Sequence, residues 1–265
     1  MKGDRIVLGA GLSGLSASYH LGGDVPVFER ADRPGGLCRS VEKNGYVFDY
    51  GPHILFSADP YASQLIKDLL GDDLLIKDRE AYIYHDRFKT FTRFPFQAHL
   101  YGLPVEVVRE CLVELFEAYA RPDSSPCKDY REWIIKTFGK GIADHLMFPY
   151  AEKLWTVPPE KMSFEWIGRR VPTPPISDIV TGALTDAKRR VGFNNSYWYP
   201  KYGGIEALVK ALAGGVEEVR CKSEITRIDP GARTVEINGE ERISYSRAIS
   251  TLPLPALISL IEGVP

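Results

Sequence analysis

The chain has 265 residues, of which 44% are hydrophobic and 26% are charged, and its formal net charge is −2. This length is sufficient for a packed core in one large domain or two smaller ones. The near-neutral charge gives no electrostatic reason to expect nucleic acid or an anionic membrane as a partner.

The cysteines are scattered along the chain without a C-x-x-C pair, at positions 38, 111, 127 and 221. This pattern disfavours a metal site and a disulfide framework, so we expect no bound metal and reduced thiols in a cytoplasmic protein. No apolar run approaches the ~20 residues that a membrane-spanning helix needs. The N-terminus leads directly into a strand rather than into a signal peptide.

Residues 5–30 predict a strand, a turn, a helix and a second strand. The apolar run at 6–8 is typical of a buried parallel strand. The spacing over 12–21 predicts a helix that a double glycine ends. The second strand is placed from Pro26, because proline fits poorly inside a central strand.

The middle of the chain predicts mainly helices. Apolar residues recur there at helical spacing, and prolines and glycines mark the ends of the helices. The helices are predicted from Pro104 to Tyr119, over 130–138 up to Gly139, and from Ile142 to Leu154 with an interruption near Pro149. The proline-rich stretch 171–175 predicts a rigid connector.

Residues 203–265 return to an alternation of helix and strands. Apolar residues from Ile205 to Leu212 form one helical face, which a double glycine closes. Short strands are predicted around 219, over 224–228, over 234–237 and over 248–251.

The first turn fits the pattern G-x-G-x-x-G, directly after a strand and at the start of a helix. Gly9 allows the tight turn, Gly11 lets the backbone approach a pyrophosphate, and Gly14 lets helix and strand pack closely. The start of the helix offers free N–H groups and a positive dipole end to phosphates. Glu29 follows at the end of the second strand, where a carboxylate accepts hydrogen bonds from ribose hydroxyls. The segment therefore predicts a dinucleotide site.

A second double glycine, Gly35-Gly36, is followed by Arg39. This segment resembles the second fingerprint of the FAD-dependent amine oxidase and protoporphyrinogen oxidase superfamily, in which it approaches the flavin side of the cofactor. The resemblance implies FAD rather than NAD, bound by a Rossmann-like domain of the GR2 type. Close backbone approach and a cation near phosphate give the segment a physical role.

Further stretches resemble one branch of that superfamily, the UDP-galactopyranose mutases, especially the eukaryotic type. They are residues 48–57, 93–97 with 103–104, 141–158 and 166–171. The resemblance implies an α/β fold, with an FAD-binding domain at 1–57 and 203–265 and an inserted, mainly helical substrate domain at 58–202.

The same resemblance implies roles for single residues. His53 beside the flavin and Arg170 on a mobile flap would be catalytic. The substrate-binding residues that it implies are Phe96 and Gln97 at the uracil, Trp155 in the sugar-nucleotide cleft and Asn195 near the substrate. The cofactor contacts that it implies are Gly9, Gly11, Gly14, Glu29, Arg30, Gly35, Gly36, Leu37, Arg39, Gly51 and Ile225, the last through its backbone to the adenine.

The activity implied is the interconversion of UDP-galactopyranose and UDP-galactofuranose, with N5 of the reduced flavin as the nucleophile. A UDP-sugar is therefore the expected small-molecule partner, and a homo-oligomer is left open. Three positions depart from the mutase pattern: Phe94 replaces a tyrosine, Ala151 an asparagine and Pro52 a glycine.

The departures at Phe94 and Ala151 leave room for an alternative, an FAD-dependent oxidoreductase of the amine oxidase or protoporphyrinogen oxidase type. A third possibility, a binding module that has lost catalysis, is favoured only by the missing C-terminal half. Family members continue for well over a hundred residues beyond the position of Pro265. We therefore expect an N-terminal portion that lacks a C-terminal half and is inactive alone.

Overall fold

A computed structural model describes residues 4–168, 170–186 and 196–263. The chain forms two compact units, which are described separately: Met1–Lys77 with Tyr197–Pro265, and Asp78–Ser196. Helix α2 (Pro60–Leu70) packs against α7 (Glu206–Ala213), which assigns it to the first unit. The domain bounds 1–57, 58–202 and 203–265 stay a prediction.

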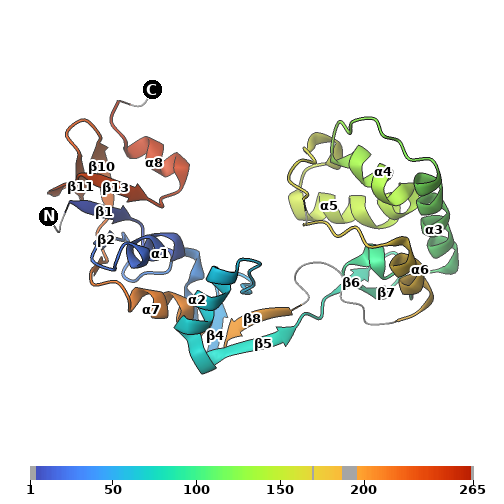
Figure 1. Ribbon diagram of the computed structural model, residues 1–265, viewed down its shortest axis with the longest axis horizontal. Coiled ribbons are helices and arrows are strands. Elements are labelled where there is room, and N and C mark those ends of the chain that lie inside the picture. The colour runs from blue at the N-terminus through green and yellow to red at the C-terminus, as the bar shows by residue number, and fades with distance from the viewer. Residues whose placement is uncertain (1–3, 169, 187–195, 264–265) are drawn as a thin grey trace. The chain divides into compact units, whose positions relative to one another are not determined.

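A four-stranded parallel sheet lies at the centre of the first unit (Figure 1). Its order is β13-β1-β2-β9, with β13 at Arg247–Ser250, β1 at Arg5–Leu8, β2 at Val27–Phe28 and β9 at Val219–Arg220. Helix α1 (Leu12–His20) connects β1 to β2, which pair in parallel. This is the predicted α/β, Rossmann-like fold, with the second strand starting one residue after Pro26.

The two faces of β1 pack against different layers, because successive strand residues point to opposite sides. Val7 belongs to a core cluster with Leu15 of α1 and Val209 of α7. Ile6 and Leu8 belong to a second cluster that includes residues of an antiparallel sheet. That sheet has the order β10-β11-β12, with β10 at Ile225–Asp229, β11 at Thr234–Ile237 and β12 at Glu241–Ser244.

Several further elements complete the first unit. They are η1 (Gly36–Cys38), β3 (Ser40–Lys43), β4 (Tyr46–Asp49), η2 (Gly71–Asp73), β5 (Leu74–Asp78), β8 (Ser196–Pro200) and α8 (Leu254–Leu260). The hairpin β3–β4 and strand β12 were not predicted. Strands β5 and β8 pair with each other, although residues 58–202 were predicted to be mainly helical.

The second unit combines helices with one hairpin (Figure 1). Its elements are β6 (Tyr82–His85), β7 (Thr90–Arg93), η3 (Phe96–Ala98), α3 (Val105–Ala120), α4 (Tyr130–Ile142), the π-helical turn η4 (Ala143–Met147), α5 (Phe148–Trp155), η5 (Pro159–Lys161) and α6 (Ile176–Leu184). The hairpin β6–β7 was not predicted, since its residues alternate only over short runs.

Helices α3 and α4 pack so closely that glycine is required between them. A Cβ on Gly139 would lie 2.5 Å from the Glu114 carbonyl oxygen, and one on Gly141 would lie 2.8 Å from that of Glu110. Gly139 has φ 75° and ψ 167°, so it interrupts the helical geometry as predicted. Hydrogen bonding nevertheless carries the helix on to Ile142, beyond the predicted end.

A half-buried carboxylate, Asp49, joins the β3–β4 hairpin to the start of α7. Asp49 Oδ1 accepts hydrogen bonds from Ser40 Oγ at 2.6 Å and from the Ile205 N–H at 3.1 Å, and its Oδ2 accepts one from Tyr199 Oη at 2.6 Å. Burial alone would raise the pKa of Asp49, but these hydrogen bonds outweigh burial and hold the pKa below its ordinary value of 3.8. The same contact and burial raise the pKa of Tyr199 to about 12, so this donor stays protonated.

We therefore expect Asp49 to make the first unit sensitive to acid. The folded state favours the ionised carboxylate, so its contribution is complete above the ordinary carboxyl pKa and is lost as pH falls through the lowered folded pKa. Thermal melts between about pH 6 and pH 3 should show a steeper loss of stability for the wild type than for Asp49→Asn. Asp72→Asn, at an exposed carboxylate of the same unit, should keep the wild-type slope. Equal slopes for all three proteins would contradict this role of Asp49.

Among the described residues, no helix has both the length and the apolar character that crossing a membrane requires.

Candidate functional site

The glycine turn of the first unit is built for close backbone approach. Gly9 follows β1 with φ +98°, and a Cβ there would lie 2.8 Å from Thr251 Oγ1. A Cβ on Gly14 would lie 1.8 Å from the Gly9 carbonyl oxygen, so α1 can start here only with glycine. A Cβ on Gly11, in contrast, would meet nothing within 4 Å. The turn therefore leaves open space beside Gly11, where a bound group can reach the backbone.

Helix α1 begins next to this open space. Gly11 is its N-cap and provides no side-chain hydrogen bond to the first turn. The first N–H groups of a helix have no partner within the helix, and their dipoles favour a negative charge. The start of α1 is thus suited to a phosphate or pyrophosphate.

Glu29 lies at the end of β2, on the same edge of the sheet. Its carboxylate accepts hydrogen bonds from the Ala10 N–H at 2.9 Å and the Ala31 N–H at 3.0 Å. Arg39 Nη2 lies 3.8 Å from Glu29 Oε1, and both side chains are largely buried. The carboxylate is therefore held firmly beside the glycine turn, as a ribose-binding group must be.

The second double glycine reaches the same turn. The Gly35 N–H donates to the Ala10 carbonyl at 2.8 Å, and Gly35 and Gly11 form an isolated parallel bridge. A Cβ on Gly36 would lie 3.4 Å from the Cα of Gly11. Leu37 directly follows and is 79% exposed, so its side chain is accessible beside the glycine turn.

The remaining predicted cofactor residues lie in the same unit. The Ser223 N–H donates to the Glu29 carbonyl at 2.8 Å, so the chain that enters β10 at Ile225 runs beside the end of β2. Arg30 is exposed. Gly51 accepts a hydrogen bond at its carbonyl from His53 Nδ1 at 2.9 Å, in the loop after β4. The individual cofactor contacts stay predictions.

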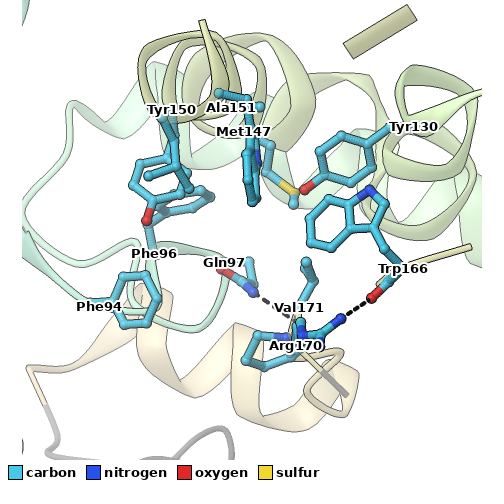
Figure 2. A pocket seen from close by; sticks show the side chains of 13 residues that line it. Phe94, Phe96, Gln97, Tyr130, Met147, Tyr150, Ala151, Trp166, Arg170 and Val171 are labelled. Carbon is cyan, nitrogen blue, oxygen red and sulfur yellow. Dashed lines mark hydrogen bonds between the residues drawn. The ribbon is translucent and has the colours of Figure 1, made fainter. Parts of the chain in front are cut away.

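The second unit contains a pocket of about 380 Å³ (Figure 2). It is formed by η3, α4, η4, α5 and the segment from 166 to 172. Its lining residues are Phe94, Phe96, Gln97, Tyr130, Met147, Tyr150, Ala151, Leu154, Trp155, Trp166, Arg170, Val171 and Pro172. Of these described lining residues, Arg170 alone carries a charge.

Aromatic rings form most of the wall of this pocket. Phe96 is 3% exposed and meets Tyr150 edge to face, with ring centroids 5.6 Å apart. Trp166 meets both Trp155 and Tyr130 edge to face, at 5.3 Å each. Trp155 is 45% exposed and so offers ring surface to a ligand. Offset and edge contacts of this kind hold rings in fixed orientations.

The polar groups of the pocket are few and fixed. Gln97 Nε2 donates to the Pro172 carbonyl at 2.8 Å, and Arg170 Nη1 donates to the Trp166 carbonyl at 3.0 Å (Figure 2). Burial, and then the nearby Tyr150, raise the pKa of Tyr130 to about 12. Tyr130 is thus a protonated hydrogen-bond donor at neutral pH.

The structure brings together four of the predicted residues, Phe96, Gln97, Trp155 and Arg170, in one pocket. It adds Tyr130, Met147, Tyr150 and Trp166, of which all but Tyr130 lie in stretches already singled out at 141–158 and 166–171. Asn195 lies outside the described residues. His53 belongs to the first unit and Arg170 to the second, so their shared catalytic role stays a prediction.

An anion-binding turn at the carboxyl edge of a parallel sheet, with an acidic residue on the next strand, defines a dinucleotide-binding protein. Within that class, the chain belongs to the family of flavin containing amine oxidoreductases, which it matches over residues 12–263. Membership confirms the predicted superfamily and its cofactor, FAD, and members of this family are enzymes. The glycine turn fits that cofactor, because the space beside Gly11 faces the start of α1.

Individual relatives point to two kinds of flavoprotein. Protoporphyrinogen oxidase 2 of Arabidopsis thaliana is 27% identical over 62% of this chain and 35% of that protein. Coproporphyrinogen III oxidase of Bacillus subtilis is 22% identical over 98% of this chain and 62% of that protein. A crystal structure of reduced UDP-galactopyranose mutase is 29% identical with a TM-score of 0.88, over 99% of this chain and 58% of that chain. The chain thus spans less than two thirds of the length of each.

Proposed function

We propose that this chain provides the ADP-binding unit and the nucleotide pocket of an FAD-dependent, mutase-like enzyme that acts on a UDP-sugar. The proposed reaction interconverts UDP-galactopyranose and UDP-galactofuranose, in the manner of the eukaryotic branch of the mutases. The observation that carries the proposal is the aromatic pocket that Arg170 lines. The likeness to reduced UDP-galactopyranose mutase over 99% of this chain supports it.

The pocket residues have chemical roles in this proposal. Trp155 offers an exposed ring face on which a uracil can stack, against a wall that contains Phe96. The guanidinium of Arg170 binds diphosphate oxygens, because its planar fork matches two of them at once. The hydroxyl of Tyr130 adds a protonated donor.

The first unit has the complementary role of holding the cofactor. Its glycine turn would hold the pyrophosphate and Glu29 the ribose of FAD, and His53 is the residue proposed to lie near the flavin. When bound, the reduced flavin supplies the nucleophile for the sugar. The protein contributes positioning and charge.

A second candidate function is an oxidoreductase of the amine oxidase or protoporphyrinogen oxidase type. Phe94 and Ala151 both line the pocket and make it less polar than the mutase pattern implies. The apolar ring system of a substrate such as a porphyrinogen suits such a wall better than a sugar does. The oxidases among the relatives support this alternative.

We expect Arg170→Ala to weaken UDP binding by about 10- to 100-fold, which is the range for a lost charge-assisted hydrogen bond. Titration of UDP with tryptophan fluorescence as the readout measures this, since Trp155 and Trp166 line the pocket. The matched control is Arg109→Ala, on an exposed arginine of α3 that is not among the lining residues. Equal UDP affinity of the wild type and Arg170→Ala would show that the diphosphate does not bind in this pocket.

Turnover distinguishes the two functions. A full-length protein that contains this chain is loaded with FAD, reduced and mixed with UDP-galactopyranose. Appearance of UDP-galactofuranose without net consumption of reductant supports the mutase. Steady hydrogen peroxide production with an amine or a porphyrinogen, and no reaction of the UDP-sugar, supports the oxidoreductase. Light scattering of the same sample tests for a homo-oligomer.

A further inference from the structure

The side chain of Gln97 is buried in the wall of the pocket, where it is 3% exposed. Its Nε2 donates to the carbonyl of Pro172, 75 positions away in the sequence, at 2.8 Å. Figure 2 shows this bond running from Gln97 to the segment that carries Val171 and Arg170. One of the two N–H donors of the amide is therefore bonded to the protein backbone. Only the second N–H and the amide oxygen remain for a direct contact with a ligand.

The bound segment is stiff. It contains Pro172, Pro174 and Pro175, each with a restricted φ, and the residue before a proline is restricted as well. At its far end the segment enters α6, where Gly182 lies in close contact with Ala98, the residue that follows Gln97. The segment is thus attached to η3 at two points, directly at Pro172 and through α6 at Gly182. A stiff segment fixed at both ends transmits the position of one end to the residues beside it.

Arg170 lies directly beside the bonded end of this segment. Its own N–H donates to the Ile167 carbonyl at 2.7 Å and its Nη1 to the Trp166 carbonyl at 3.0 Å. These bonds fold Arg170 onto the preceding turn, but they are local and do not attach that turn to η3. Apolar packing places Ile167 in the same core cluster as Phe96 of η3. The bond from Gln97 to Pro172 adds a directional contact between η3 and the residues beside Arg170.

We propose that Gln97 is a positioning residue that holds Arg170 for the anion of a nucleoside diphosphate, rather than a group that recognises the base. This inference rests on the proposed function for the identity of the ligand. The tether, which is the hydrogen bond from Gln97 to Pro172, does not depend on that function. Loss of the Nε2 donor would let the 171–175 segment move, so that Arg170 would meet the diphosphate less often in a productive geometry. Binding of the base alone would be unaffected.

The test uses Gln97→Met, which keeps the length of the side chain and removes its donors, with UDP and uridine as probes. We expect UDP affinity to fall about five- to tenfold, as for one lost hydrogen bond, and uridine affinity to stay unchanged. The double variant Gln97→Met with Arg170→Ala should lose little more UDP affinity than Arg170→Ala alone, because Gln97 acts through Arg170. Gln64→Met, the same change on α2 of the other unit, is the control.

Equal losses for UDP and uridine would overturn the proposal, since they would assign Gln97 to the base. Additive effects of the Gln97 and Arg170 variants would overturn it as well. If neither UDP nor uridine binds the wild type, the proposed function is refuted. A measurement without ligand then still tests the tether. Hydrogen exchange at the Arg170 and Val171 amides should be faster in Gln97→Met, and unchanged exchange would refute the tether.

Discussion

Replacing Gly14 with alanine is expected to abolish FAD binding and to destabilise the first unit by about 3 kcal/mol, at the upper end of the usual overpacking cost. The added Cβ would lie 1.8 Å from the Gly9 carbonyl oxygen, a backbone atom that no side-chain rotation can move away. Relief requires α1 to shift from the end of β1, and this shift destroys the glycine turn. The corresponding fall in melting temperature is about 6–12 °C, measured on the protein without FAD because bound cofactor adds its own stabilisation.

Gly11→Ala is the matched variant that separates folding from binding. Its Cβ would meet nothing within 4 Å, so the melting temperature without FAD should equal that of the wild type. The same Cβ would occupy the open space beside the start of α1, so FAD affinity should fall on the order of tenfold or more. A Gly11→Ala protein that binds FAD as tightly as the wild type would show that the pyrophosphate does not lie there. A Gly14→Ala protein with an unchanged melting temperature would contradict the packing argument.

The dinucleotide turn could be predicted from sequence because all its determinants are local. A short apolar strand, three glycines at fixed spacing and Glu29 lie within 25 residues or so of one another, and each has one physical role there. The structure adds contacts that spacing alone does not show, such as the hydrogen bond from the Ala10 N–H to Glu29. Those contacts explain why the carboxylate is fixed, but they did not have to be known to predict the turn.

Two hairpins of the first unit were missed although the sequence contains their signal. Asn44-Gly45 joins β3 to β4, and Asn238-Gly239 lies between β11 and β12, with positive φ at all four residues. An Asn-Gly pair between strands favours such turns because both residues adopt positive φ at low cost. The short flanking strands alternate only weakly between apolar and polar residues, so hydrophobic periodicity does not indicate these hairpins.

The aromatic pocket of the second unit could be predicted only in part, and for a different reason. Phe96, Trp155 and Arg170 were associated through a family resemblance, because nothing in their spacing indicates that they meet. Trp166 was within a recognised stretch, but its edge-to-face contacts depend on how α5 and the following turn pack. The bond from Gln97 to Pro172 spans 75 positions, and a carbonyl acceptor leaves no trace in the residue type. Tertiary contacts of this kind have no local signature.

The second large effect is expected at Gly182, where alanine should destabilise the second unit by about 3 kcal/mol. Gly182 lies inside α6, and its Cβ would be 1.8 Å from the Ala98 carbonyl oxygen. Helix propensity alone predicts the opposite sign, because alanine in a helix interior is favoured over glycine by up to about 1 kcal/mol. The sign of the change in stability therefore decides whether the backbone contact between α6 and η3 is present.

Gly214→Ala, at the end of α7, is the control for the same substitution. Its nearest atom would be 3.4 Å from the new Cβ and its φ is −61°, so stability should change little or rise slightly. Gly182→Ala should also weaken UDP binding, because Ala98 directly follows Gln97 and a displaced η3 moves one wall of the pocket. A more stable Gly182→Ala protein with unchanged UDP affinity would show that α6 and η3 are not in backbone contact, and the two-point attachment of the 171–175 segment would then be wrong.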